Sequence, residues 1–159
     1  MQLFRFGPKG QENPGVVVDN VHKDCSAHFE DWNRDFFNND GMSKLRALVD
    51  KEGGGLPNTP ADARFGACVA RPHMLMCIGL NYSDHAAESG MEPPDKPVIF
   101  QKSTSAVSGP FDDVTIPKNS TKTDWEVELG VVIGKDALYL ESLDQAKDHI
   151  VGYCISQDV

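Results

Sequence analysis

The sequence predicts a β-rich α+β fold made of short strands and short helices. Apolar and β-branched runs are bounded by glycine, proline and asparagine, which is the pattern of strands that end in turns. Segments with helical spacing are brief and begin at serine or aspartate residues that suit an N-cap. The composition, 40% hydrophobic and 25% charged over 159 residues, is that of a globular chain. We expect strands at residues 3–6, 16–18, 74–78, 98–102, 114–116, 124–133 and 151–155.

The first part of the chain predicts a small domain over residues 1–70. Its two strands are joined by a turn-rich link, and residues 29–37 are expected to form a helix that ends at an Asn-Asn-Asp-Gly turn. A second helix is expected to start at Ser43 and to end at Gly53. Glycines and prolines then concentrate in residues 53–60, which indicates a connection between elements.

Residues 71–159 are expected to form part of a second domain. Its first strand leads into a helix of one or two turns, which Ser83 or the next residue caps and Gly90 ends. A proline-rich extended loop precedes the following strand. Residues 142–145 have the form of a capping box and predict a helix that continues to about Gly152.

The strand at 124–133 carries two carboxylates in an otherwise apolar run. Side chains on a strand alternate between faces, so Glu126 and Glu128 point the same way, roughly 7 Å apart, while their apolar neighbours point the other way. Two ionised carboxylates side by side repel each other unless a positive group lies between them. A divalent cation satisfies both, and Asp158 offers a third carboxylate. The alternative is the solvent-exposed polar face of an edge strand.

His85 and Glu88 lie three residues apart in the expected short helix, so they share one helical face. The carboxylate can orient the imidazole and raise its basicity, which is what a general base needs in order to act on water. The alternative is an ordinary pair of surface side chains.

The bulk charge and the cysteine pattern exclude several classes of partner. The net charge of -9 argues against a nucleic-acid surface and against binding to an anionic membrane, because both require clustered Lys and Arg. The N-terminus lacks the apolar stretch of a secretory signal, and no run is long enough to cross a bilayer. The four cysteines are scattered without Cys-x-x-Cys spacing, so we expect no zinc site, no disulfide framework and a cytoplasmic location.

Several motifs together resemble the fumarylacetoacetate hydrolase family. The N-terminal stretch at residues 3–15 is similar to the bacterial members that act on sugar-derived diketo acids or are labelled ureidoglycolate lyase. The other motifs follow in order within residues 71–159: Gly79-Leu80-Asn81-Tyr82-x-Asp84-His85-x-x-Glu88, Phe100-x-Lys102, Asp124-x-Glu126-x-Glu128-Leu129 and the late Asp158.

The resemblance implies a fold and a cofactor. The expected fold is a small N-terminal domain followed by part of a mixed β-sandwich roll. The expected cofactor is Mg²⁺ or Mn²⁺, bound by Glu126, Glu128 and Asp158. Members of the family form homodimers or larger assemblies, so we expect the full-length protein to be a homo-oligomer.

The resemblance also implies hydrolytic cleavage of a carbon–carbon bond in a 2,4-diketo acid, such as an acylpyruvate or a sugar-derived diketo acid. His85, oriented by Glu88, is the expected catalytic base, and Tyr82 and Lys102 are expected to bind substrate. The same metal-assisted chemistry suits a decarboxylase, an isomerase or a ureidoglycolate lyase. The chain stops at Val159, before the family pattern does, so a C-terminally truncated, non-catalytic fragment is a further alternative.

Overall fold

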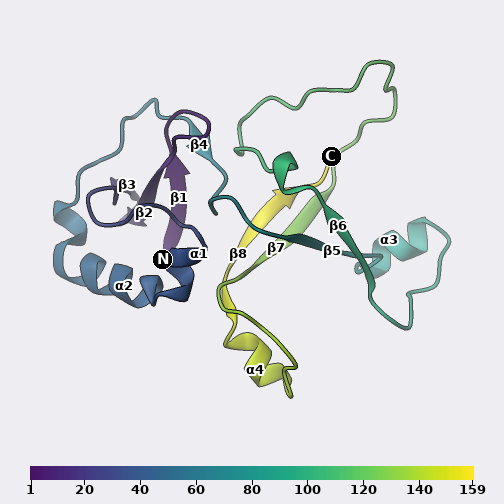
Figure 1. The fold of residues 1–159 in the computed structure, drawn as a ribbon. Helices are drawn as coiled ribbons and strands as arrows, with labels where there is room; N and C mark the ends of the chain where they lie inside the picture. Colours follow the sequence, from purple (N-terminus) through teal and green to yellow (C-terminus); the bar gives the residue numbers. More distant parts are fainter. The chain divides into compact units, whose positions relative to one another are not determined.

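Four strands from the first 70 residues form an antiparallel sheet in the computed structural model, which describes residues 1–159. The sheet has the strand order β3-β2-β1-β4 (Figure 1). Asp19 and Asn20 join β2 to β3 with φ angles of 49° and 62°, as a two-residue type I′ hairpin turn requires. The sequence predicts β1 and β2 but not β3 and β4. The strands are β1 (Gln2–Phe6), β2 (Asn13–Val18), β3 (Val21–Asp24) and β4 (Phe65–Gly66).

Two helices follow the third strand, with boundaries that differ from the expected ones. Helix α1 (Arg34–Asn38) starts five residues later than predicted because the Asn33 side chain accepts a hydrogen bond from the Phe36 backbone N–H at 2.9 Å and caps the helix there. Helix α2 (Gly41–Glu52) starts two residues before Ser43. A 3₁₀ turn, η1 (Gly53–Gly55), continues from it.

The buried core lies within this N-terminal region. Trp32 is fully buried at its centre, and its indole N–H donates to the backbone carbonyls of Phe4 at 2.9 Å and Gly15 at 3.1 Å. The indole therefore contributes apolar area and also satisfies its one polar atom against the sheet. The cluster consists of Val16, Cys25, Trp32, Phe36, Leu45 and Leu56.

A network of ion pairs extends from Arg5 of β1. Arg5 donates two hydrogen bonds to the carboxylate of Asp31, at 2.6 and 2.8 Å, and both residues are buried. Glu12 accepts from Arg5 at 3.3 Å and from Arg64 at 2.9 Å. Arg64 in turn binds both carboxylate oxygens of Asp112 at 2.6 Å. The network therefore ties the segment around Asp112 to the N-terminal sheet.

Residues 71–107 contain one hairpin and one short helix. Strands β5 (Leu75–Gly79) and β6 (Val98–Lys102) pair antiparallel, from Leu75 opposite Lys102 to Gly79 opposite Val98. Helix α3 (Ser83–Glu88) lies in the connection between them (Figure 1). A 3₁₀ turn, η2 (Thr104–Ala106), follows β6. The strands and the short helix lie where the sequence predicts them, but the N-cap of α3 is Tyr82 and not Ser83 or Asp84, and no side chain caps the helix.

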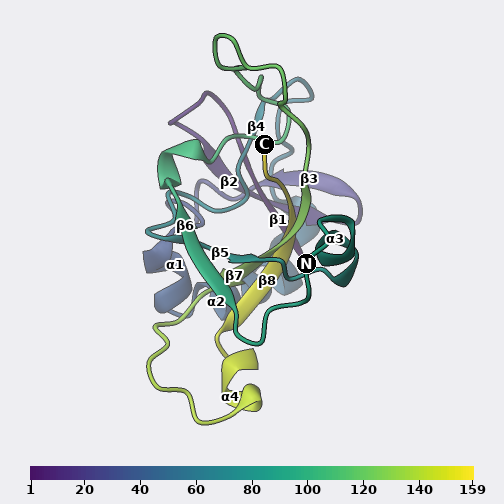
Figure 2. The same ribbon diagram turned by 90° about the vertical axis from the view of Figure 1, so that its right-hand side faces the viewer.

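The last part of the chain forms a second hairpin. Strands β7 (Val127–Ile133) and β8 (Ile150–Gln157) pair antiparallel, and helix α4 (Leu143–Lys147) lies in their connection, at the end of the hairpin away from the C-terminus (Figure 2). Ser142 caps α4 as predicted, but the helix ends at Lys147, since the chain enters β8 at Ile150.

The strand expected at residues 114–116 is not present. Val114 and Ile116 are exposed, and no other segment pairs with them, so the run has no ladder to join. The expected strand at 124–133 begins only at Val127, where the pairing with β8 begins.

The contacts within the chain separate residues 71–107 from the rest, which comprises residues 1–70 and 108–159. The first boundary falls where the sequence places the end of the N-terminal domain, while the division into 1–70 and 71–159 stays a prediction. None of the helices is long and apolar enough to cross a bilayer. The β-rich α+β class expected from the sequence is confirmed.

Candidate metal centre

Two glutamates stand at the start of β7. Glu126 directly precedes the strand and Glu128 is its second residue, so the alternation of side chains along the extended backbone places both on one face of the β7–β8 hairpin. The apolar residues between and after them, Val127 and Leu129, are 71% and 61% exposed. The glutamates therefore occupy the opposite side of the hairpin from an exposed apolar side.

The antiparallel register brings Asp158 to the same place. Val127 pairs with Gln157 in the antiparallel ladder. Glu126 precedes Val127 and Asp158 follows Gln157, so these two residues are opposite one another. The backbone N–H of Asp158 donates to the Glu126 carbonyl at 2.9 Å, which continues the pairing past the end of both strands. Side chains that are opposite in an antiparallel pair share a face.

The three predicted ligands are thus brought together. One carboxylate oxygen from each of Glu126, Glu128 and Asp158 lies within 4.8 Å of the others; Glu126 is exposed, and the other two are partly buried. Oxygen ligands bonded to a divalent cation at about 2.0–2.6 Å lie roughly 3–5 Å apart, so the spacing fits such an ion. Three carboxylates without nitrogen or sulfur favour Mg²⁺, Mn²⁺ or Ca²⁺ over softer metals.

A cavity of about 430 Å³ opens beside two of these carboxylates, Glu126 and Asp158. Its other walls come from the loop that leads into β7, and that loop supplies one lysine and three hydroxyl groups. The sequence analysis assigns none of these loop residues to the site. The remaining lining residues are Val114, Thr115, Pro117, Ser120, Lys122, Thr123, Asp124 and Val159.

A thiol shares the hairpin face with the glutamates. Cys154 is opposite Gly130, and a side chain added at Gly130 would place its Cβ 2.6 Å from the Cys154 Sγ. Cys68 interacts with the same thiol; burial, and next the neighbouring Cys154, raise the pKa of Cys68 to about 11. In the absence of a metal, Cys68 is therefore a protonated thiol at neutral pH.

The other residues predicted for the site belong to residues 71–107. His85 and Glu88 both lie on α3 and are exposed, and no hydrogen bond or ion pair joins the two side chains. Tyr82 is the N-cap residue of α3. Lys102 is the last residue of β6 and is partly buried. The structure therefore has no contact through which Glu88 orients His85 in the way that the sequence predicts.

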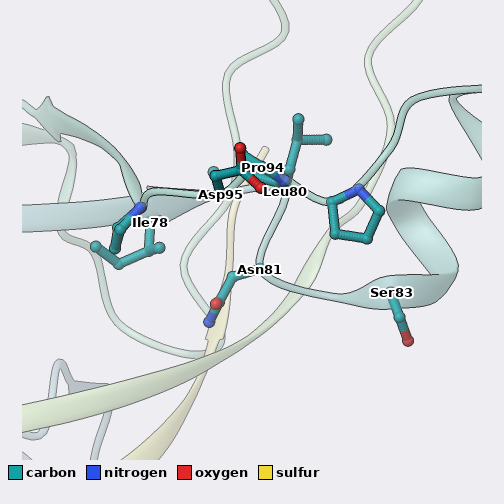
Figure 3. A pocket seen from close by; sticks show the side chains of 9 residues that line it. Ile78, Leu80, Asn81, Ser83, Pro94 and Asp95 are labelled. Atoms are coloured by element: carbon teal, nitrogen blue, oxygen red, sulfur yellow. The ribbon is translucent and has the colours of Figure 1, made fainter.

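A second cavity, of about 310 Å³, lies within residues 71–107. Leu80 and Asn81, which follow β5, line it together with Pro94 and Asp95 of the proline-rich loop (Figure 3). Neither His85 nor Glu88 is among its lining residues. Its polar groups are one amide, one hydroxyl and one carboxylate, so it offers no cluster of metal ligands.

Comparisons with known proteins identify the same family as the motifs on α3, β6 and the β7–β8 hairpin. The family profile described as "Fumarylacetoacetate (FAA) hydrolase C-terminal" matches residues 74–159. A protein from Burkholderia multivorans, whose name places it among hydrolases, is 48% identical over 162 residues; the match covers 100% of this chain and 55% of that protein. The chain thus spans about half the length of the curated relatives it matches.

Two solved structures share the fold. The fumarylacetoacetate hydrolase of Exiguobacterium antarcticum is 27% identical with a TM-score of 0.72, over 99% of this chain and 55% of that one. The maleylpyruvate hydrolase of Sphingobium sp. SYK-6 is 26% identical with a TM-score of 0.73, over 99% of this chain and 57% of that one. The carboxylate-bearing hairpin lies inside the residues that the family profile matches, and the chain belongs to the fumarylacetoacetate hydrolase family.

Proposed function

We propose that this chain provides the metal-binding part of a Mg²⁺- or Mn²⁺-dependent hydrolase that cleaves a carbon–carbon bond in 2,4-diketo acids. The observation that carries the proposal is the meeting of Glu126, Glu128 and Asp158, which the pairing of β7 with β8 brings together from segments about 30 residues apart in the sequence. Three carboxylates this close repel one another, and a divalent ion with open coordination positions offsets that repulsion.

Each carboxylate has a defined part in this proposal. Glu126, Glu128 and Asp158 would hold the ion and leave part of its coordination open toward the cavity of about 430 Å³. The bound ion would supply Lewis-acid stabilisation of the negative charge that develops on a 2-keto oxygen during cleavage. The cavity walls would then exclude bulk water from part of the substrate, which strengthens electrostatic interactions inside it.

His85 and Glu88 enter the proposal through the family motif that they belong to. His85 would take a proton from the attacking water, and Glu88 would position the imidazole. Tyr82 and Lys102 would contact the substrate. The names of the structural relatives support the substrate class, because maleylpyruvate hydrolase and fumarylacetoacetate hydrolase are both named for the hydrolysis of a keto acid.

The test is a substrate panel with the full-length protein. An acylpyruvate, oxaloacetate and ureidoglycolate are each incubated with Mg²⁺, with Mn²⁺ and with EDTA. We expect the acylpyruvate to be hydrolysed to pyruvate and a second acid, with activity lost in EDTA and restored by added metal. Consumption of oxaloacetate alone would indicate a decarboxylase, and activity that persists in EDTA would overturn the metal assignment.

A further inference from the structure

The cavity beside the carboxylates has an unusual charge distribution. Glu126, Asp158 and the neighbouring Asp124 all line it, whereas Lys122 is the one cationic residue in its wall. Lys122 belongs to the loop before β7 and carries a charge opposite to that of the candidate metal ligands. A ligand that enters the cavity therefore meets three carboxylates and one ammonium group in its wall.

Lys122 has no partner within the protein. It is exposed and takes part in no hydrogen bond or ion pair, although the carboxylates of Asp124, Glu126 and Asp158 line the same cavity. The adjacent polar groups do have partners: the Asp124 carboxylate accepts from the Trp125 backbone N–H at 2.8 Å, and Ser120 and Thr123 share a hydrogen bond at 2.9 Å. The ammonium group is therefore available to a ligand.

We propose that Lys122 is a specificity-determining residue that binds a second carboxylate on the substrate, distal to the 2-keto acid group. This inference rests on the proposed function, because it takes the 2-keto acid end of the substrate to be held at the Glu126–Glu128–Asp158 cluster. It assigns the protein to substrates that carry a carboxylate at both ends.

Charge balance gives the physical reason. The candidate ligands carry three negative charges and Asp124 adds a fourth, so a divalent cation leaves the surroundings of the cavity negative. A substrate with two carboxylates would be repelled from such a wall. Lys122 offsets this repulsion at the point where the distal group enters, and it offers ammonium donors to the carboxylate. A monocarboxylate gains nothing from it.

A matched pair of 2-keto acids tests this assignment by binding, without turnover. 2-Oxoglutarate and 2-oxopentanoate have the same carbon chain and differ only in a distal carboxylate in place of a methyl group. Calorimetric titration of the full-length protein in Mg²⁺ should show 2-oxoglutarate binding about 2- to 5-fold more tightly, as expected for one partly solvated charge pair. The preference should shrink as NaCl is raised.

Variants separate a role in specificity from a structural role. Lys122→Met should abolish the preference, with unchanged affinity for Mg²⁺ and for 2-oxopentanoate, and Lys122→Arg should retain it. Lys118→Met, in the same loop but outside the cavity lining, is the matched control and should retain the wild-type preference. Equal loss of affinity for both acids in Lys122→Met would show a structural role and overturn the assignment.

The outcomes also distinguish this inference from the proposed function. A wild-type protein that binds Mg²⁺ and both acids with equal affinity overturns the role of Lys122 and leaves the proposed function standing. A wild-type protein that binds Mg²⁺ but neither acid overturns both.

Discussion

The backbone N–H of Asp158 donates a hydrogen bond to the backbone carbonyl of Glu126 at 2.9 Å. This bond lies one position beyond the last pair of the β7–β8 ladder, Val127 with Gln157. The main chain therefore sets the separation of two candidate metal ligands, and neither side chain is needed to hold the other in place. Isosteric substitutions at the two positions can remove a charge and leave the geometry of the hairpin intact.

Removing one carboxylate should weaken metal binding without unfolding the chain. Glu126→Gln and Asp158→Asn should each lower the affinity for Mg²⁺ and Mn²⁺ by at least about 10-fold, since even loss of an outer-shell partner costs that much. Glu126→Ala should abolish metal binding and activity together. Calorimetric titration measures the affinity, and circular dichroism checks the fold. Asp124→Asn, next to the site but outside the three-carboxylate cluster, is the control. An equal loss of metal affinity in Asp124→Asn would show that the nearby negative charge, and not direct ligation, sets the affinity.

Substitution of His85 should separate chemistry from metal binding. In the full-length protein, His85→Ala should lower kcat by about 10²–10⁴-fold, the range for loss of a general base, with unchanged affinity for Mg²⁺. His28→Ala, an exposed histidine of the N-terminal region, should have wild-type kinetics. Acylpyruvate hydrolysis at the normal rate by His85→Ala would contradict the assignment of the base.

Two glycines of the second hairpin should respond differently to a methyl group. At Gly130 an added Cβ would lie 2.6 Å from the Cys154 Sγ, so the Cys154 side chain or the strand that carries it must shift, whereas at Gly152 it meets nothing within 4 Å. We expect Gly130→Ala to lower the free energy of unfolding by about 1–3 kcal/mol and to weaken Mg²⁺ binding, because Glu128 is two residues away. Gly152→Ala should be neutral or slightly stabilising. Urea unfolding measures the free energy of unfolding of the two variants. Equal changes in Gly130→Ala and Gly152→Ala would contradict the close approach at Gly130.

The Arg64–Asp112 ion pair predicts an acid-dependent loss of stability. Hydrogen bonds from Arg64, and next from the Gly109 backbone N–H, hold the pKa of Asp112 at about 2, below its usual value of 3.8. Because the pKa is lower in the folded state, this contribution to stability is complete above about pH 4 and is lost as the pH falls through 2. Urea midpoints of the wild type and Asp112→Asn should differ at pH 6 and converge near pH 2. A constant difference across this range would rule out the linkage.

The two tryptophans provide a test of the core. Trp32→Phe should destabilise the protein by about 2–4 kcal/mol, because it leaves a void and removes the donor to the carbonyls of Phe4 and Gly15. Trp125→Phe should change the stability by less than about 0.5 kcal/mol, since Trp125 is 79% exposed. Trp125→Phe also isolates the fluorescence of Trp32, which should be blue-shifted and should move to the red on unfolding.

Local patterns predicted most strands but not the weakest ones. The runs that became β1, β5 and β6 are apolar and bounded by turn residues, so their sequence is sufficient to identify them. Strand β3, Val-His-Lys-Asp, has no such pattern and forms because the Asp19–Asn20 turn folds it back onto β2. The opposite error occurred at residues 114–116, where a β-branched run has no partner strand.

The amino-acid sequence by itself determined that Glu126 and Glu128 share a face, since the alternation of side chains along an extended chain is a local property of the backbone. Only the tertiary structure decided that Asp158 joins them, because this depends on the antiparallel register that pairs Val127 with Gln157, 30 positions apart along the chain. The same pairing forms one wall of the cavity that Lys122 lines. A shift of the register by one residue would turn the side chain of Asp158 to the opposite face of the hairpin.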